Sequence, residues 1–537
     1  MLTRRTALMG LGAGVLASPS AHSALLPALQ LLKYKTLVPE IFQAIPRPPT
    51  YTPCLVIGSG FGGAISALRL GQAGQQVTVL ERGSQWPTDP WRDIFSNDTL
   101  PDGRAFWHTN SAKMIAGNTA YFDRFGGVMD ATVYPNMTVW RGAAVGGGSV
   151  VFTGCMIQPE RRYFDAIFGG ALSFDEMNAV YYPRVRAMLN LSTIPSDLYN
   201  ANAFRHSRTW DAQVRAAGYT TTLSESIFNW NVVRAETRLQ SRASATVGLS
   251  NHGNSNGAKF DLNQNYLKQA KETGRVRVYP GHEVQGIGWD GSRYTVDVVK
   301  RHPDGTQLDR YVLTCDKLFL GAGSIGTSEL LVKAQATGNL RNLNAEVGKG
   351  WGTNGDTTVV RSLALTGGIT QASPSASRVH DAASGLPVTL ENWYVPGLPV
   401  DLGVIGSLGM VFDQTHRGDF RYDPATGSVK LNWAADGNDD AIAVSRTVNN
   451  RICAATGAIP GVPFITPDVS GRNWTAHPLG GAVLNKATDG FGRVVGHPGL
   501  YVVDGALIPG TTGAVNPSLT ISALAERNIE KIIAEGR

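Results

Sequence analysis

A glycine-rich turn, Gly58-Ser59-Gly60-Phe61-Gly62-Gly63, limits the possible folds of this 537-residue chain more than any other feature. The turn directly follows the apolar run at 54–57, which is typical of a strand buried on both faces. Residues 64–70 then show the apolar spacing of a helix, and residues 76–80 predict a second strand. Together these segments predict a strand, a helix and a second strand, the unit from which Rossmann-like α/β domains are built.

Three glycines of this turn each have a physical role in such a unit. Gly58 permits the tight turn, Gly60 lets the backbone approach a pyrophosphate, and Gly63 allows the helix to pack closely. The phosphate then lies at the N-terminus of the helix. Glu81, 23 positions after Gly58, is placed to accept hydrogen bonds from a ribose, and an acid there disfavours a 2′-phosphate. The turn therefore predicts FAD or NAD rather than NADP.

Three further glycine-rich segments favour FAD over NAD. Residues 141–149 are too glycine-dense for an ordinary turn and suit backbone that lies flat against a flavin and its diphosphate. Residues 321–326 close another strand, and residues 503–510 offer an acid and small residues to hold a ribityl chain. The residues of the glycine-rich segments that are expected to bind the cofactor, together with Glu81, are Gly58, Gly60, Gly62, Gly63, Gly146, Gly147, Gly148, Ser149, Asp504 and Gly505.

The length of the chain and the spread of its strand signals predict two domains, because 537 residues exceed what one hydrophobic core usually supports. Strand signals recur at 276–279, 294–299, 317–320 and 500–503. We therefore expect an α/β protein with a discontinuous Rossmann-like FAD-binding domain at 50–160, 260–347 and 468–537. The intervening segments are rich in aromatic, Asn and turn residues and predict an α+β cap, a substrate-binding domain built on a β-sheet, at 161–259 and 348–467.

Residues 1–23 have the order of a bacterial export signal. Arg4 and Arg5 precede the uncharged stretch 9–17, and small residues follow near 21–23. The paired arginines favour the twin-arginine route, although Ala7 stands where that signal often has Phe, and an ordinary Sec signal is the alternative. The apolar stretch is shorter than the ~20 residues of a spanning helix, so we expect an exported protein, secreted or periplasmic, without a permanent anchor.

Charge and cysteine use exclude several classes of protein. The net charge is +6 and no basic run is present, so no nucleic-acid partner is expected. Cys54, Cys155, Cys315 and Cys453 are far apart and form no C-x-x-C pair, which predicts neither a metal site nor a disulfide framework. Cys54 and Cys315 lie in or beside apolar strand-like runs and are expected to be small buried hydrophobes.

An ordered set of motifs accompanies the glycine turn at 58–63 over residues 50–537. The motifs are Gly146-Gly147-Gly148-Ser149, Asn251-His252-Gly253, residues 321–324, residues 346–352, His477-Pro478-Leu479-Gly480-Gly481 and Val515-Asn516-Pro517. The set resembles the glucose-methanol-choline (GMC) oxidoreductase family, and within it the cholesterol oxidases that bind FAD non-covalently. The turn at 141–149 has no His to which flavin is attached in some members, so non-covalent FAD is expected. The resemblance also implies that Val284 and Asn516 bind the cofactor.

The resemblance implies three catalytic residues. His477 and Asn516 match the pair over the flavin face, where His477 activates the substrate hydroxyl with a pKa suited to neutral pH and Asn516 orients it. Glu391 matches the acid that moves a steroid ring proton, and burial there raises a carboxyl pKa. Without the resemblance, His477 would be interpreted as a turn cap, Asn516 as a turn former before Pro and Glu391 as a surface acid at a strand end.

The implied reaction is oxidation of a 3β-hydroxysteroid by molecular oxygen, giving hydrogen peroxide and a 3-ketosteroid, followed by isomerisation of the 5-ene to the 4-en-3-one. A sterol substrate implies transient contact of a surface loop with a membrane, and we expect a monomer. Phe152, Cys155 and Thr389 replace an Asn, a Met and a Phe that are usual in these oxidases. The resemblance therefore points to a steroid more firmly than to cholesterol itself.

Two other functions remain open from the sequence. One is a GMC oxidase or dehydrogenase of a non-steroid alcohol, from which Glu391 would distinguish the steroid enzyme because most such relatives have no use for an acid there. The other is a lipid-binding protein that keeps the fold without turnover. The intact set Gly58, Gly60, Gly63, Glu81 and Asp504 counts against the second.

Overall fold

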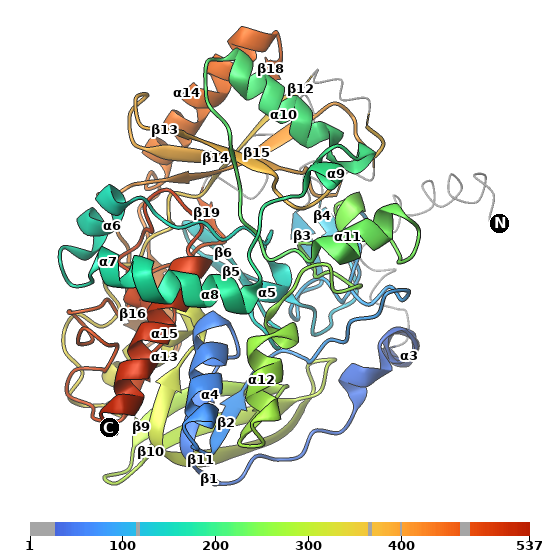
Figure 1. Ribbon diagram of the computed structural model, residues 1–537. Helices are drawn as coiled ribbons and strands as arrows, with labels where there is room; N and C mark the ends of the chain where they lie inside the picture. The colour runs from blue at the N-terminus through green and yellow to red at the C-terminus, as the bar shows by residue number, and fades with distance from the viewer. Residues whose placement is uncertain (1–26, 114–118, 363–367, 398–399, 462–472, 537) are drawn as a thin grey trace.

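The computed structural model describes residues 27–113, 119–362, 368–397, 400–461 and 473–536, and the predicted export signal lies outside these ranges. The chain forms two sheet-based layers, one in the lower half and one in the upper half of Figure 1. Within the described ranges, no helix has the length and apolar character needed to cross a bilayer. The predicted α/β fold class is confirmed.

The lower sheet has seven strands and begins with the predicted strand, helix and strand. β1 (Tyr51–Ile57) leads through α4 (Phe61–Gln72) to the parallel β2 (Val77–Leu80). The other predicted strands are confirmed in the same sheet, where β11 lies parallel to β1 and β10 antiparallel to β11. The full order is β8 (Val276–Tyr279), β2, β1, β11 (Gln307–Leu320), β10 (Tyr294–Arg301) and β9 (His282–Trp289), with β20 (Leu500–Val502) parallel to β11.

Three helices lie side by side along this sheet, with α4 in contact with both α12 (Tyr266–Glu272) and α15 (Ser518–Ala534) (Figure 1). A fourth, α13 (Gly323–Ala336), contacts β9. Cys54 and Cys315 are at most 1% exposed within the core between the sheet and its helices, as expected, and their thiols are free. Residues 54–57 of β1, all of β2 and the last three residues of β11 are therefore buried on both faces, which explains their unbroken apolar runs.

The upper sheet is antiparallel, and α10 (Arg205–Ala216) and α14 (Asp439–Thr456) cover one of its faces. Val388 and Leu390 point toward these helices. Because side chains alternate along a strand, Glu391 and Trp393 point to the opposite face. The order is β18 (Ile459–Pro460), β12 (Thr357–Ser362), β15 (Ile405–Val411), β14 (Val388–Trp393), β13 (Ser377–Asp381) and β7 (Thr222–Leu223).

A small three-stranded sheet positions two of the predicted motifs together. β6 (Met137–Gly142) leads into the second glycine turn, and β19 (Trp474–Thr475) leads to His477. The two strands are parallel neighbours, with Thr475 opposite Val139, so both motifs leave the same edge of the sheet. The third strand is β5 (Met129–Tyr134), and the remaining strand pairs are β3 (Ser111–Lys113) with β4 (Thr119–Tyr121) and β16 (Asp419–Asp423) with β17 (Ser428–Asn432).

Segments from the predicted substrate-binding part also contribute to the core of the lower sheet. Phe164 of α6 (Arg161–Phe168), Tyr182 of α8 (Tyr182–Leu189) and Phe420 of β16 belong to that core. The predicted domain boundaries stay a prediction. The other α-helices of the described ranges are α3 (Pro27–Leu37), α5 (Gly148–Val151), α7 (Phe174–Glu176), α9 (Ser196–Tyr199) and α11 (Trp230–Thr237).

Candidate functional site

A cavity of about 740 Å³ extends from the two glycine turns to the face of the upper sheet opposite α10 and α14. Trp393 and Leu408 of the upper sheet line one end of it. Most of the residues predicted to bind a cofactor or substrate line it as well. These are Gly58, Gly60, Gly62, Glu81, Gly147, Gly148, Val284, Asp504, Gly505, His477 and Asn516, whereas Gly63, Gly146, Ser149 and Glu391 lie outside its lining.

The first glycine turn has the shape that a pyrophosphate requires. Gly58 has φ +88°, and a Cβ there would lie 2.2 Å from the Gly321 carbonyl oxygen. At Gly60, in contrast, a Cβ would meet only the Gly147 Cα, at 4.0 Å. No side chain caps the N-terminus of the 12-residue α4, so the first N–H groups of this helix face the cavity unpaired. Such an end binds phosphate.

Two buried carboxylates flank this turn. Glu81 accepts hydrogen bonds from the Ser59 hydroxyl (2.7 Å) and the Gly83 N–H (2.9 Å), and burial raises its pKa. Asp504 accepts from the Thr327 hydroxyl (2.6 Å), and burial raises its pKa to about 6. One oxygen of each carboxylate accepts a single hydrogen bond from the described residues, Glu81 Oε1 from the Gly83 N–H and Asp504 Oδ1 from the Ala506 N–H. Both groups therefore retain capacity toward ribose and ribityl hydroxyls. The residues present therefore fit FAD.

Gly63, Gly146 and Ser149 lie outside the cavity lining, and their contacts stabilise the two glycine turns. A Cβ on Gly63 would lie 2.1 Å from the Gly58 carbonyl oxygen, so the close helix packing expected of Gly63 is present. The Gly146 N–H donates to the Ser59 hydroxyl at 3.0 Å, which joins the two glycine turns. The Ser149 hydroxyl donates to the Gly146 carbonyl at 2.7 Å and fixes the second turn.

Replacing Gly58 with alanine is expected to destabilise the fold by about 2–6 kcal/mol, the sum of left-handed strain and the clash with Gly321. The purified variant should also lose most of its flavin. Gly74 is a matched control because it has φ +83° with nothing within 4 Å of an added Cβ. Gly74→Ala should cost only the strain, about 1–3 kcal/mol, and keep its flavin. Melting temperature measures the stability, and the flavin-to-protein absorbance ratio measures the bound flavin. Equal losses of both in the two variants would contradict the proposed role of the Gly58 turn in binding the pyrophosphate.

At the other end of the cavity, His477 is held by a carboxylate that the sequence did not indicate. Its Nδ1 lies 2.7 Å from Asp356 Oδ1, and the Asp356 side chain is fully buried. The other Asp356 oxygen accepts from the Thr475 hydroxyl (2.9 Å) and from the N–H groups of Ala476 (2.9 Å) and His477 (3.1 Å). An ionised carboxylate only accepts, so this geometry assigns the proton to Nδ1 and leaves the Nε2 lone pair for a substrate.

The pKa of His477 reflects two opposed effects. Burial disfavours the imidazolium and lowers this pKa, but the Asp356 charge and hydrogen bond outweigh burial and leave the pKa above its ordinary value. The sequence did not indicate Asp356 as the partner of His477, because the two residues are 121 positions apart and no fixed spacing links them. The available signal was an acid five residues after the Trp351 of the 346–352 motif.

Glu391 lies beside this site on β14, where Leu408 is its neighbour in register. It is 1% exposed, and burial raises its pKa to about 7 despite the opposing effects of His477 and Asn516. Within the described ranges, Glu391 Oε1 and Asn516 Oδ1 are buried without a hydrogen-bond partner. Unpaired buried oxygens are rare in folded proteins, and two together beside a cavity indicate a ligand site.

The three departures from the usual pattern lie around the same site. Phe152 lines the cavity and packs edge-on against Phe61, with ring centroids 5.6 Å apart. Cys155 is buried near Glu391, and burial raises the pKa of its thiol. The Thr389 hydroxyl lies 3.1 Å from His380 Nδ1. All three substitutions therefore alter the walls of the site while its polar groups are kept.

The chain is similar in sequence to known oxidoreductases. Residues 421–525 match the family model described as GMC oxidoreductase. The chain is 26% identical to a protein named cholesterol oxidase from Mycobacterium tuberculosis (88% of this chain, 89% of the relative). It is 23% identical to a cholesterol oxidase from Acinetobacter baumannii, over 90% of this chain and 94% of the relative.

Solved structures share the fold. Pyridoxine 4-oxidase from Mesorbium loti superposes with a TM-score of 0.61 at 17% identity, covering 89% of this chain and 99% of that one. A fungal aryl-alcohol oxidase superposes with a TM-score of 0.59 at 13% identity, covering 91% of this chain and 100% of that one. Residues 421–525, which match the GMC oxidoreductase model, contain His477 and Asp504.

Proposed function

We propose that this protein oxidises a 3β-hydroxysteroid with oxygen, using non-covalently bound FAD, to give hydrogen peroxide and a 3-ketosteroid. We further propose that it isomerises the 5-ene to the 4-en-3-one. The observation that carries the proposal is the buried carboxyl of Glu391 beside His477 and Asn516, since an alcohol oxidation alone has no need of it. The similarity to two proteins named cholesterol oxidase over most of the chain supports it.

In the oxidation, His477 Nε2 accepts the proton of the substrate hydroxyl while a hydride leaves the carbon that carries this hydroxyl. Asn516 holds the hydroxyl oxygen in line with Nε2, and Asp356 keeps the imidazole in the accepting tautomer. FAD, when bound, supplies the hydride acceptor, and oxygen takes up the two electrons as hydrogen peroxide.

In the isomerisation, Glu391 takes a proton from C4 of the 5-en-3-one and returns it to C6. The 5,6 double bond moves to the 4,5 position, and no proton is gained or lost overall. With a pKa of about 7, the carboxyl of Glu391 both accepts and releases a proton near neutral pH. Its surroundings therefore match its proposed role.

The proposal extends to export by the twin-arginine route and to transient membrane contact by a monomer. Exposed apolar side chains in the predicted substrate-binding segment 348–467 support the membrane contact, among them Ile369 (72% exposed) and Leu402 (63% exposed). The Asp401 N–H donates to the Ile369 carbonyl at 2.9 Å, so the two loops lie together.

Anaerobic addition of cholesterol to the purified holoenzyme tests the proposed reaction. Bleaching of the flavin absorbance followed by growth of a conjugated enone band is the expected result. Bleaching without an enone would remove the isomerase role of Glu391. Bleaching by another alcohol but not by cholesterol or other 3β-hydroxysteroids would establish the alternative, a GMC-type oxidase or dehydrogenase of non-steroid alcohols. A colourless protein would favour a lipid carrier.

A further inference from the structure

The cavity contains a second cluster of polar side chains, Asp98, His252 and Tyr394, outside the His477 site. All three line the cavity and are 6% exposed or less. His252 Nδ1 lies 2.9 Å from Asp98 Oδ1, and the Tyr394 hydroxyl donates to Asp98 Oδ2 at 3.3 Å. Burial and the Asp98 charge hold the pKa of Tyr394 well above its ordinary value, so this hydroxyl stays protonated. The reaction proposed above uses none of these groups.

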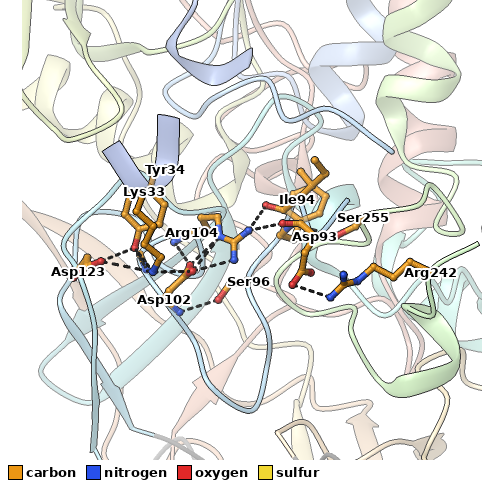
Figure 2. Close-up of polar contacts among 12 residues, drawn as sticks. Lys33, Tyr34, Asp93, Ile94, Ser96, Asp102, Arg104, Asp123, Arg242 and Ser255 are labelled. Carbon is orange, nitrogen blue, oxygen red and sulfur yellow. Dashed lines mark hydrogen bonds and ion pairs between the residues drawn. The ribbon is translucent and has the colours of Figure 1, made fainter. Parts of the chain in front are cut away.

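Hydrogen bonds join the two ends of the loop that carries Asp98 (Figure 2). Arg104 donates to the carbonyl oxygens of Asp93 and Ile94 and so joins the end of the loop to its beginning. The Asp102 N–H donates to the Ser96 hydroxyl at 2.9 Å. Contacts at both ends limit the conformations of the loop and favour a defined position for Asp98, as a preorganised binding site requires.

The same network joins this loop to the segment of His252. The Phe95 N–H donates at 3.2 Å to the hydroxyl of Ser255, which follows His252 by three residues (Figure 2). Tyr34 of α3 accepts from the Gly103 N–H at 2.9 Å and holds the loop from outside. The three members of the cluster come from positions 98, 252 and 394, so the fold has assembled them from distant segments.

The cluster leaves one hydrogen-bonding atom for a ligand. Because Nδ1 of His252 faces a carboxylate, this nitrogen carries the proton, and Nε2 is left to bond elsewhere. No described residue bonds Nε2, and the edge of the ring packs on Phe106, with centroids 5.0 Å apart. A hydroxyl group suits Nε2 in either state, since it donates to a neutral imidazole and accepts from a protonated one.

This cluster is separate from the reacting centre: among the described residues, no hydrogen bond joins Asp98, His252 or Tyr394 to His477. Tyr394 follows Glu391 by three residues and lies just beyond the end of β14. The cavity wall also includes the apolar rings of Trp393 and Trp140. The cavity therefore has two polar clusters in a wall that also carries apolar rings.

We propose that the substrate is an alcohol with a second, distal hydroxyl group, and that His252 is the hydrogen-bond partner of that group. The inference deepens the proposed function, because it rests on oxidation of an alcohol in this cavity and specifies the substrate class. The asparagine, histidine and glycine at 251–253 thereby acquire a role in specificity, and His252 acts as a binding residue rather than in the chemistry.

Calorimetric titration of the chemically reduced holoenzyme tests the inference, since the reduced enzyme binds alcohols without turning them over. Two matched pairs serve as probes, androst-5-en-3β-ol with androst-5-ene-3β,17β-diol, and decan-1-ol with decane-1,10-diol corrected for its two equivalent ends. The wild type should bind the better-fitting diol about tenfold more tightly than its mono-alcohol, the effect of one good hydrogen bond. His252→Phe should bring this ratio close to one.

His416→Phe is the control, because His416 Nδ1 also bonds an aspartate, Asp413, at 2.7 Å, and His416 does not line the cavity. This variant should keep the tenfold ratio. A ratio near one for both pairs in the wild type, or an unchanged ratio in His252→Phe, overturns the inference. Bleaching of the oxidised enzyme by decanol but by neither steroid would instead overturn the steroid proposal, and the decane pair would still decide the role of His252.

Discussion

Asp356→Asn is expected to slow anaerobic flavin bleaching by substrate about 10²–10⁴-fold, the usual range for loss of a general base. Three donors, from Thr475, Ala476 and His477, require an oxygen at the Oδ2 position. The amide nitrogen of the asparagine must then face His477 Nδ1 and donate to it. This moves the imidazole proton to Nε2, which no longer accepts the proton of the substrate hydroxyl. Stopped-flow absorbance at saturating alcohol measures the loss.

The pH dependence separates this role from a merely structural one. In the wild type the bleaching rate should rise with pH through the raised pKa of His477, because only the neutral imidazole accepts a proton. Without the Asp356 charge and hydrogen bond, burial still lowers the pKa of His477 and only the Glu391 charge opposes it, so the midpoint should move to lower pH in the variant. A slower variant with an unchanged midpoint would contradict the argument.

Asp413→Asn is the matched control for this experiment. Asp413 also bonds a histidine Nδ1, that of His416, and accepts the N–H groups of Thr415 and His416 through its other oxygen. The pair does not line the cavity. The variant should therefore tolerate the same substitution with a bleaching rate within about twofold of the wild type, since effects of separate sites are close to additive.

The sequence predicted the parts of this protein that depend on short spacing. The turn from Gly58 to Gly63 follows a strand and opens a helix, and local steric rules explain each glycine in it. The Cβ geometry at Gly58 and Gly63 shows the close contacts that such rules require. The place of His477 near the glycine turns depends on the parallel pairing of β6 with β19, and the family resemblance supplied it rather than any spacing.

The sequence did not predict the residues that act through distant partners. Asp356 reaches His477 across 121 positions, and Asp98 reaches His252 across 154. No periodicity or motif encodes such pairs, because they form only when separate domains and loops pack together. Likewise, Ser149 was expected at the cofactor, whereas its hydroxyl bonds the backbone of Gly146. A polar residue in a glycine turn serves the turn or the ligand, and sequence alone does not distinguish the two.

Glu391→Gln is expected to separate oxidation from isomerisation. Glutamine keeps the size of the side chain but does not take up a proton from C4, so enone formation should fall about 10²–10⁴-fold while flavin bleaching continues. The 5-en-3-one should accumulate as the product. In the wild type, enone formation should rise with pH through about 7, where the carboxyl ionises. Glu391→Asp keeps a carboxylate and should retain part of the isomerisation, and equal enone rates in the wild type and Glu391→Gln would contradict the role.

Stability gives an independent measure of the same carboxyl. Its pKa rises from 4.5 to about 7 on folding, so the folded state binds more protons between these values, and stability falls as pH rises through this window. The shift corresponds to about 3 kcal/mol of stability lost by the wild type between pH 4.5 and pH 8. Glu391→Gln should lack this loss, so melting temperatures of the two proteins should diverge as pH rises. Parallel pH profiles would show that Glu391 is not the buried acid that its proposed chemistry requires.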